Sequence, residues 1–143
     1  MKIQHMLDQK GHDVHAISRR STMEQAVGVL GEKNIGAVVV TDDDGAVCGI
    51  LSERDVVRHM SRSGAGILSS SVDEFMTKNV VTCGLDGDLQ DIMQIMSTRR
   101  IRHLPVVEDG KLTGIVSIGD VVKRKIELAE KEAESLKQYI AAG

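Results

Sequence analysis

Hydrophobic and polar positions along the chain follow one plan that is used twice. In the first half, residues 22–34 carry apolar side chains at helical spacing, and the continuous valine-rich run at 35–40 is typical of a buried strand. A polar turn at 42–45 separates this run from a further apolar stretch. The elements predicted for the first half are a strand at 14–17, a helix at 22–34, strands at 35–40 and 46–51, and a helix at 52–60.

The second half predicts the same order of elements. These are a strand at 80–83, a helix at 88–98, strands at 102–107 and 112–116, and a helix that starts near Ser117. The stretch between the halves is rich in Ser and Gly without hydrophobic periodicity, which predicts a flexible linker. The expected organisation is a first repeat with an N-terminal segment at 1–62, a linker at 63–71, a second repeat at 72–126 and a C-terminal helical extension at 127–143.

Direct repetition of sequence supports this duplication. The nine-residue segments Gly49–Val57 and Gly114–Val122 are identical at six positions, and both contain the pattern Gly-Ile-apolar-Ser-x-x-Asp. Asp55 is thus equivalent to Asp120 after the polar turn, and Ile35 to Ile101 before it, with one residue fewer in the second turn. The pattern therefore predicts an α/β (α+β) fold of two β-α-β-β-α repeats with a long C-terminal helix.

The last predicted helix continues beyond its repeat with a regular apolar pattern. Successive apolar residues are spaced 4, 3, 4, 3 and 4 apart, at Val122, Ile126, Ala129, Ala133, Leu136 and Ile140. This is the a/d spacing of a coiled-coil seam, which favours self-association of two chains. The alternative is a helix that packs on its own domain.

Composition narrows the classes of function. The chain is 41% hydrophobic and 27% charged with a net charge of −3, so no basic footprint indicates a nucleic-acid partner. No apolar run is as long as a membrane span, so no membrane partner is expected either. Cys48 and Cys83 lack metal or redox spacing and are expected to be buried thiols in a cytoplasmic, reducing setting. No metal-ligand cluster and no nucleophile beside a base is visible, so we expect neither a metal site nor an enzyme.

The two Ser-x-x-Asp motifs have two open interpretations. Ser52 with Asp55, and Ser117 with Asp120, follow a strand and precede a helix, which is the arrangement of a helix N-cap. A carboxylate at such a corner also accepts hydrogen bonds from a cis-diol such as ribose, and the adjacent helix N-terminus favours phosphate. Chemistry alone leaves capping, and capping combined with ligand binding, as alternatives.

A cluster of cations precedes the strand of the second repeat, in the segment Arg99–Pro105. The two arginines at its start suit a helix C-terminus. Arg102 and His103 fall within the predicted strand, where a guanidinium suits a phosphate. Pro105 has no N–H for a strand ladder, which predicts that its strand lies at an edge or is interrupted.

On these residues the chain resembles a tandem pair of CBS domains, a Bateman module. The resemblance rests on the two Gly-Ile-apolar-Ser-x-x-Asp motifs and on the run Arg-Ile-Arg-His-Leu-Pro-Val, and it covers residues 14–126. The chain is similar to small stand-alone CBS-pair proteins of bacteria and plant mitochondria. The resemblance implies repeats packed around a pseudo-twofold axis, a homodimer and an unidentified regulated protein. It also implies binding of AMP or another adenosyl ligand (ADP, ATP, NAD(H) or S-adenosylmethionine) without a metal.

The resemblance also assigns ligand contacts position by position. In the second repeat, it implies that Asp120 holds the ribose hydroxyls, with Ser117 beside the ribose or phosphate. Arg102 and His103 are then the phosphate contacts. The residues that enclose adenine are Thr82 and the backbone of Ile101, Arg102, His103, Leu104 and Pro105.

In the first repeat, the resemblance gives Ser52 and Asp55 the corresponding roles, with Arg54 reaching a phosphate. This repeat has Ala16 where the second has Thr82, and it lacks the arginine, histidine and proline of the second strand. We therefore expect the Asp120 half-site to bind a nucleotide well and the Asp55 half-site to bind weakly or differently. The expected function is a non-enzymatic sensor of adenosyl ligands, and the alternative is a structural scaffold with vestigial sites.

Overall fold

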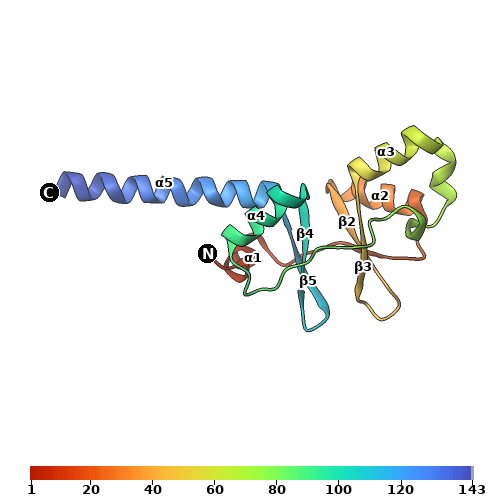
Figure 1. Ribbon diagram of the computed structural model, residues 1–143, viewed down its shortest axis with the longest axis horizontal. Helices are drawn as coiled ribbons and strands as arrows, with labels where there is room; N and C mark the ends of the chain where they lie inside the picture. Colours follow the sequence, from red (N-terminus) through yellow and green to blue (C-terminus); the bar gives the residue numbers. More distant parts are fainter. Residues whose placement is uncertain (143) are drawn as a thin grey trace.

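The computed structural model describes residues 1–142 and has a mixed α/β architecture (Figure 1). The first half contains α1 (Ile3–Lys10), β1 (Ala16–Ser18), α2 (Met23–Lys33), β2 (Ala37–Thr41), β3 (Val47–Ser52) and α3 (Glu53–Ser63). Two short 3-10 helices follow, η1 (Ala65–Ser69) and η2 (Val72–Glu74). The second half contains α4 (Leu89–Arg99), β4 (His103–Glu108), β5 (Lys111–Ser117) and α5 (Ile118–Ala142). Apart from one strand, the helices and strands predicted for the two repeats are confirmed.

The two repeats form separate small sheets with matching register. In the first sheet β1 runs parallel to β2, and β2 pairs antiparallel with β3; in the second, β4 pairs antiparallel with β5. Ala37 lies opposite Ser52 in the first sheet, and His103 lies opposite Ser117 in the second. These pairs are equivalent in the alignment of the two repeats, and both sheets have a register shift at the equivalent place.

The strand predicted at 80–83 does not form. Cys83 makes a single parallel bridge to β4, in which its N–H donates to the Pro105 carbonyl at 3.0 Å. In the first repeat the residue equivalent to Pro105 is Val39, whose N–H donates to the His15 carbonyl at 3.2 Å. Proline has no N–H, so the second sheet lacks this hydrogen bond and its third strand stops at one bridge. Of the two alternatives predicted from Pro105, the structure shows the edge, because β4 pairs with β5 alone and continues through Pro105.

The segment between the repeats is not the unstructured linker that its composition indicates. Its first residues, up to Ser63, belong to α3, and η1 begins two residues later. Ile67 is 4% exposed in the core of the first repeat, and the Ser70 carbonyl accepts a hydrogen bond from Met23 N at 2.8 Å. One buried side chain leaves no periodic signal in the sequence, which explains why the prediction was wrong.

The N-terminal segment packs on the second repeat, although the predicted boundary groups it with the first. α1 places Ile3, Met6 and Leu7, all at most 3% exposed, in the same core cluster as Leu104 and Val116. Figure 1 shows α1 beside α4 and the second sheet.

The leading segment of the second repeat makes the reverse contact. Val72 and Met76 lie in the core of the first repeat, as the counterparts of Ile3 and Leu7 in α1. The backbone repeats this relation, because Ile3 N donates to the Gly87 carbonyl and Val72 N donates to the Ser21 carbonyl, both at 2.8 Å. The repeats have exchanged their leading segments, so each core is completed by the other half of the chain.

The predicted long C-terminal helix is confirmed as α5, which extends away from the rest of the molecule in Figure 1. Its first turns pack on the second repeat, where Val121 is 1% exposed. From Leu128 to Ala142 every residue is exposed. Among residues 1–142, no helix has both the length and the apolar character that crossing a membrane requires.

Candidate ligand-binding site

Both Ser-x-x-Asp motifs form helix caps. At the start of α3, Asp55 N donates to Ser52 Oγ at 3.2 Å, and Ser52 N donates to Asp55 Oδ2 at 3.0 Å. At the start of α5, Asp120 N donates to Ser117 Oγ at 3.1 Å, and Ser117 N donates to Asp120 Oδ2 at 2.9 Å. The capping interpretation is therefore confirmed for both motifs, and each cap fixes the direction of its carboxylate.

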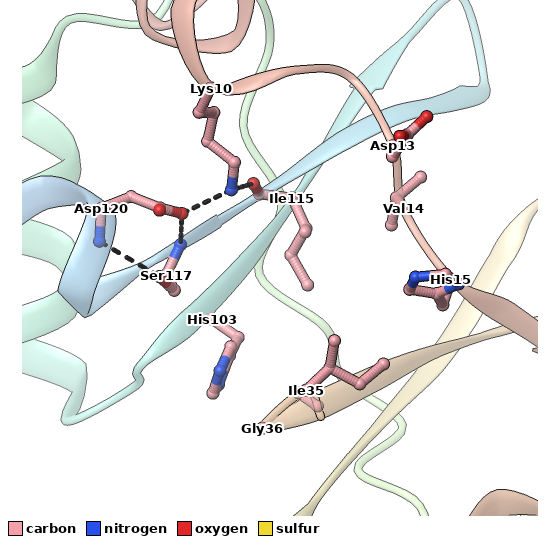
Figure 2. A pocket seen from close by; sticks show the side chains of 11 residues that line it. Lys10, Asp13, Val14, His15, Ile35, Gly36, His103, Ile115, Ser117 and Asp120 are labelled. Carbon is pink, nitrogen blue, oxygen red and sulfur yellow. Dashed lines mark hydrogen bonds and ion pairs between the residues drawn. The ribbon is translucent and has the colours of Figure 1, made fainter. Parts of the chain in front are cut away.

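A cavity of about 340 Å³ lies between the two repeats beside Asp120 (Figure 2). The second repeat contributes the ends of its paired strands and the start of α5. The first half contributes the end of α1, the chain before β1 and the start of β2. The wall consists of Lys10, Asp13, Val14, His15, Ile35, Gly36, Ala37, His103, Ile115, Ser117 and Asp120. Apolar side chains with a few polar groups are the usual lining of a small-molecule site.

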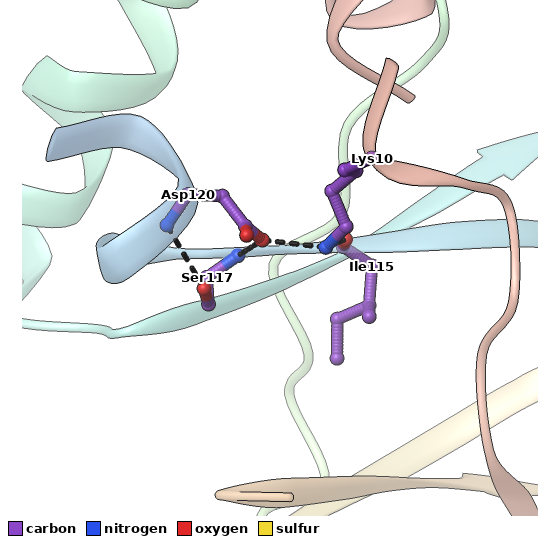
Figure 3. A network of polar contacts seen from close by, with 4 residues as sticks. All are labelled: Lys10, Ile115, Ser117 and Asp120. Atoms are coloured by element: carbon purple, nitrogen blue, oxygen red, sulfur yellow. Dashed lines mark hydrogen bonds and ion pairs between the residues drawn. The ribbon is translucent and has the colours of Figure 1, made fainter. Parts of the chain in front are cut away.

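Lys10 connects α1 to this cavity. Its Nζ donates to the Ile115 carbonyl at 2.8 Å and to Asp120 Oδ2 at 2.5 Å (Figure 3). Burial raises the pKa of Asp120, but the hydrogen bonds from Lys10 and Ser117 outweigh burial and hold this pKa below its ordinary value of 3.8. Asp120 is therefore an anion at neutral pH, and the Lys10 ammonium balances its charge.

His103 reaches from the second repeat to the first. A Cβ on residue 36 would lie 3.2 Å from His103 Nε2, so the glycine at this position leaves room for the imidazole. Burial lowers the pKa of His103 below its ordinary value of 6.5, although the Asp120 carboxylate acts in the opposite direction. The imidazole is therefore neutral at pH 7 and offers one hydrogen-bond donor and one acceptor.

The structure brings only part of the predicted contact set to the cavity. His103, Ser117 and Asp120 lie on its wall. The remaining predicted residues lie outside the wall: Thr82 and Arg102, which are exposed, Leu104 and Pro105, which are buried, and Ile101, Ser52, Arg54 and Asp55.

Arg102 was expected beside Asp120 but lies outside the cavity wall. The cavity takes its acid from one repeat and residues 35–37, at the start of β2, from the other. The equivalent residues at the start of β4 are 101–103, and the acid equivalent to Asp120 is Asp55. This relation favours Arg102 beside Asp55, but His103 of the same segment lies on the wall beside Asp120, so the predicted grouping of Arg102 with Asp120 stays a prediction.

The Asp55 half-site has different polar partners. Asp55 Oδ1 accepts a hydrogen bond from Arg58 Nη2 at 2.5 Å, whereas Asp120 is bound by Lys10 from another segment. Arg54 lines a depression on the surface of α3 with Glu53, Val57, Arg58 and Ser61. Within residues 1–142, no three His, Cys, Asp or Glu side chains are grouped so as to hold a metal ion.

The N-terminal side of the cavity is the part that sequence reasoning missed. Lys10 lies 110 residues before Asp120 and belongs to a helix that was not predicted. The available signal is the apolar spacing of Ile3, Met6 and Leu7, which is that of an amphipathic helix.

Comparisons of this chain with known proteins all match CBS-domain proteins. The model of the CBS domain matches residues 11–62 and 72–127. The mitochondrial CBS domain-containing protein CBSX3 of Arabidopsis thaliana is 35% identical over 126 residues, which are 85% of this chain and 61% of the relative. The chain thus spans about three fifths of the length of that protein.

Solved structures agree with this relation. A CBS-domain containing protein from Agrobacterium tumefaciens is 46% identical with a TM-score of 0.84, covering 87% of this chain and 99% of that chain. Two more distant structures share the fold. One, from Pyrobaculum aerophilum, is complexed with AMP (21% identity, TM-score 0.76, covering 84% of this chain and 89% of that chain). The other, the CBS domain pair of protein MJ0100, is in complex with 5'-methylthioadenosine and S-adenosyl-L-methionine (22%, TM-score 0.77, covering 86% and 94%). The family match covers both repeats of the fold, and the chain belongs to the CBS domain family as a tandem pair.

Proposed function

We propose that this chain is a non-enzymatic regulatory module that binds an adenosyl ligand in the cavity beside Asp120. The observation that carries the proposal is the Asp120 carboxylate, which the α5 cap orients and which lies on the wall of a cavity between the repeats. The AMP, 5'-methylthioadenosine and S-adenosyl-L-methionine complexes of the distant CBS proteins support the ligand class.

The wall of the cavity has the chemistry that an adenosine group needs. A carboxylate accepts hydrogen bonds from both hydroxyls of a ribose, which is the role proposed for Asp120. Val14, Ile35 and Ile115 provide apolar surface on which the faces of adenine can pack. The neutral His103 imidazole adds a donor and an acceptor beside them.

The charges on the wall favour ligands with few phosphates. Asp13 and Asp120 contribute two carboxylates, and Lys10 contributes one ammonium. Each added phosphate brings negative charge toward these acids, which is unfavourable in a partly desolvated site. Among AMP, ADP, ATP and NAD(H), we therefore propose AMP as the preferred nucleotide of this cavity.

Titration calorimetry with Asp120→Asn tests the proposal. The full chain is titrated with adenosine, AMP, ADP, ATP, NADH and S-adenosyl-L-methionine, and we expect binding with AMP tighter than ATP. Asp120→Asn should weaken AMP binding by at least about tenfold, because an amide replaces the carboxylate that accepts the diol. Asp55→Asn is the matched control, since Asp55 holds the same type of cap at the start of α3. If Asp55→Asn removes the tighter site instead, the assignment of the half-sites is reversed.

Two other outcomes separate this proposal from its alternatives. No binding and no thermal shift with any of these ligands would leave a scaffold with vestigial sites, because a ligand that binds the folded state raises its stability. Steady product formation from ATP by the pure protein would instead make the chain an enzyme.

The proposed mechanism is a shift between arrangements of the two repeats. A ligand held between them changes the population only as far as its affinity differs between the arrangements. The partner that responds is a regulated protein, and the proposed assembly is a homodimer. The proposed setting is a reducing, cytoplasmic compartment, in keeping with the free, half-buried thiols of Cys48 and Cys83.

A further inference from the structure

The projecting part of α5 carries an uncovered apolar stripe. Val122, Ile126, Leu136 and Ile140 are 49%, 54%, 59% and 68% exposed. Figure 1 shows the helix leaving the body of the molecule, and all residues from 128 to 142 are exposed. An amphipathic helix gains most of its stability by packing its apolar face, so this stripe requires a partner.

The spacing of the stripe fits a second copy of the same helix. The six apolar residues alternate between d and a positions of a heptad, beginning with Val122 at d and ending with Ile140 at a. In this frame the e positions are Lys123, Glu130 and Lys137, and the g positions are Lys125, Glu132 and Tyr139.

The flanking charges discriminate between the two orientations of such a pair. In a parallel, in-register pair each g residue faces the e residue five positions later on the other helix. Lys125 then faces Glu130 of the second copy, and Glu132 faces Lys137 of the second copy. Both contacts pair opposite charges. Because the dimer is twofold symmetric, each contact occurs twice.

The antiparallel alternative brings like charges together. The register that pairs all six core positions sets Val122 against Ile140 of the second copy. In that register Lys123 lies opposite Lys137 of the second copy. Glu130 lies opposite Glu130 of the second copy, and Glu132 lies opposite Glu132. Shifting the register by a heptad removes these contacts but leaves apolar core positions uncovered.

We propose that residues 122–140 of two copies form a parallel, in-register coiled coil along the twofold axis of a homodimer. The coiled coil places both CBS pairs at the same end of the dimer. None of the residues 122–140 lies on the cavity wall, so the coiled coil needs no ligand contact to form.

Disulfide trapping in the full chain tests the orientation. Leu136→Cys places a thiol at a d position, where the two copies meet only in the parallel register, so mild oxidation should give a cross-linked dimer in high yield. Gln138→Cys is the control, because it lies on the opposite face of the helix and should cross-link only by collision. Wild type gives the background from Cys48 and Cys83. A mixture of Val122→Cys and Ile140→Cys chains that cross-links in preference to Leu136→Cys would establish the antiparallel pair, and no trapping in either case would overturn the proposal.

A charge exchange tests the pairing itself. Glu130→Lys faces Lys125 of the second copy with a like charge at two symmetric places and should raise the dimer dissociation constant by about tenfold at low salt. The double variant Glu130→Lys with Lys125→Glu restores opposite charges and should recover the dimer. Sedimentation and the trapping yield of Leu136→Cys measure both effects. A double variant no better than the single one contradicts the parallel register.

Discussion

At the scale of single residues, Lys10 controls the charge of the cavity. Among the described residues, it is the only Lys or Arg on a wall that also contains two carboxylates. Its ammonium donates a hydrogen bond to Asp120 Oδ2, so a ribose diol bound there would compete with it for this carboxylate. The same ammonium attracts a phosphate. We therefore expect Lys10 to weaken binding of a nucleoside and to strengthen binding of its monophosphate.

Replacing Lys10 by alanine should lower the preference of the cavity for AMP over adenosine. In Lys10→Ala the carboxylate of Asp120 is free for a diol, so adenosine should bind more tightly, while AMP loses its cation. We expect the ratio of AMP to adenosine affinity to fall by about tenfold, as measured by calorimetry at low salt. Lys10→Arg keeps the positive charge and should keep a ratio close to wild type. A parallel change in both affinities would show that Lys10 does not select between the ligands.

His103 should make the stability of the folded chain depend on pH. Burial holds the pKa of His103 below the ordinary value of 6.5, so the unfolded chain binds this proton more tightly than the folded chain. The contribution of the neutral His103 to the free energy of unfolding should therefore be complete above about pH 6.5. It should be lost as the pH falls below the lowered pKa of the folded chain. His103→Gln removes this contribution, and its thermal midpoint should fall less than that of wild type over this pH range. Equal acid sensitivity of the two proteins would contradict the prediction.

Only the local contacts of the candidate site could be predicted from the sequence. The caps were predictable because Ser117 and Asp120 are three residues apart and their chemistry is local. The contact between Lys10 and Asp120 was not, because α1 reaches this acid only through the exchange of segments between repeats. Alignment of the repeats does not say which elements face one another across the cavity, so the place of Arg102 beside Asp120 or Asp55 stays a prediction.

At the scale of elements, the close approach of α1 to β5 explains one glycine of the repeated motif. A Cβ on Gly114 would lie 2.9 Å from Leu7 Cδ1, and Leu7 is fully buried. Gly49 is the equivalent residue in β3 and is covered in the same way by Met76. The motif glycines are therefore where each sheet accepts the segment that the other repeat supplies.

Alanine at this glycine should loosen α1. Gly114→Ala forces Leu7 to move within a packed core and should lower the free energy of unfolding by about 1–3 kcal/mol, measured by urea denaturation. Gly28→Ala is the control, because it lies in α2 with nothing within 4 Å of the added Cβ. It should raise stability by about 0.5–1 kcal/mol through helix propensity. Equal effects of both substitutions would show that the contact with Leu7 is not tight.

At the element scale, most predictions from periodicity were correct. The four strands that pair in the two sheets as β2–β3 and β4–β5 were predicted, because their apolar runs are long and are separated by polar turns. The strand at 80–83 was wrong for a reason present in the sequence, since Pro105 removes the hydrogen bond that would hold it. η1 was missed because the burial of Ile67 is decided by tertiary contact.

At the scale of the whole molecule, the exchanged segments make the two cores interdependent. α1 fills the second core and residues 72–76 fill the first, although each segment leads the opposite repeat. Loss of either repeat exposes the segment that it covers. We therefore expect the chain to unfold in a single cooperative transition.

A substitution that leaves a cavity in the first core should also destabilise the second core. Met76→Ala, at a residue 7% exposed in the first core, should cost about 2–5 kcal/mol. Under cooperative unfolding, amide-exchange protection should fall equally in β2 and β4. Calorimetry should still give one transition. Loss of protection confined to β2 would show that the repeats unfold independently.

The exchange has a consequence for how such a chain can be divided. Each half carries an arm that serves the other half, so a cut between the repeats yields two fragments that are each other's missing part. Two copies of one half also contain two arms and two sheets that accept them, related by a twofold axis. The fold of this chain is therefore that of an arm-exchanged symmetric dimer whose two subunits are joined in one polypeptide.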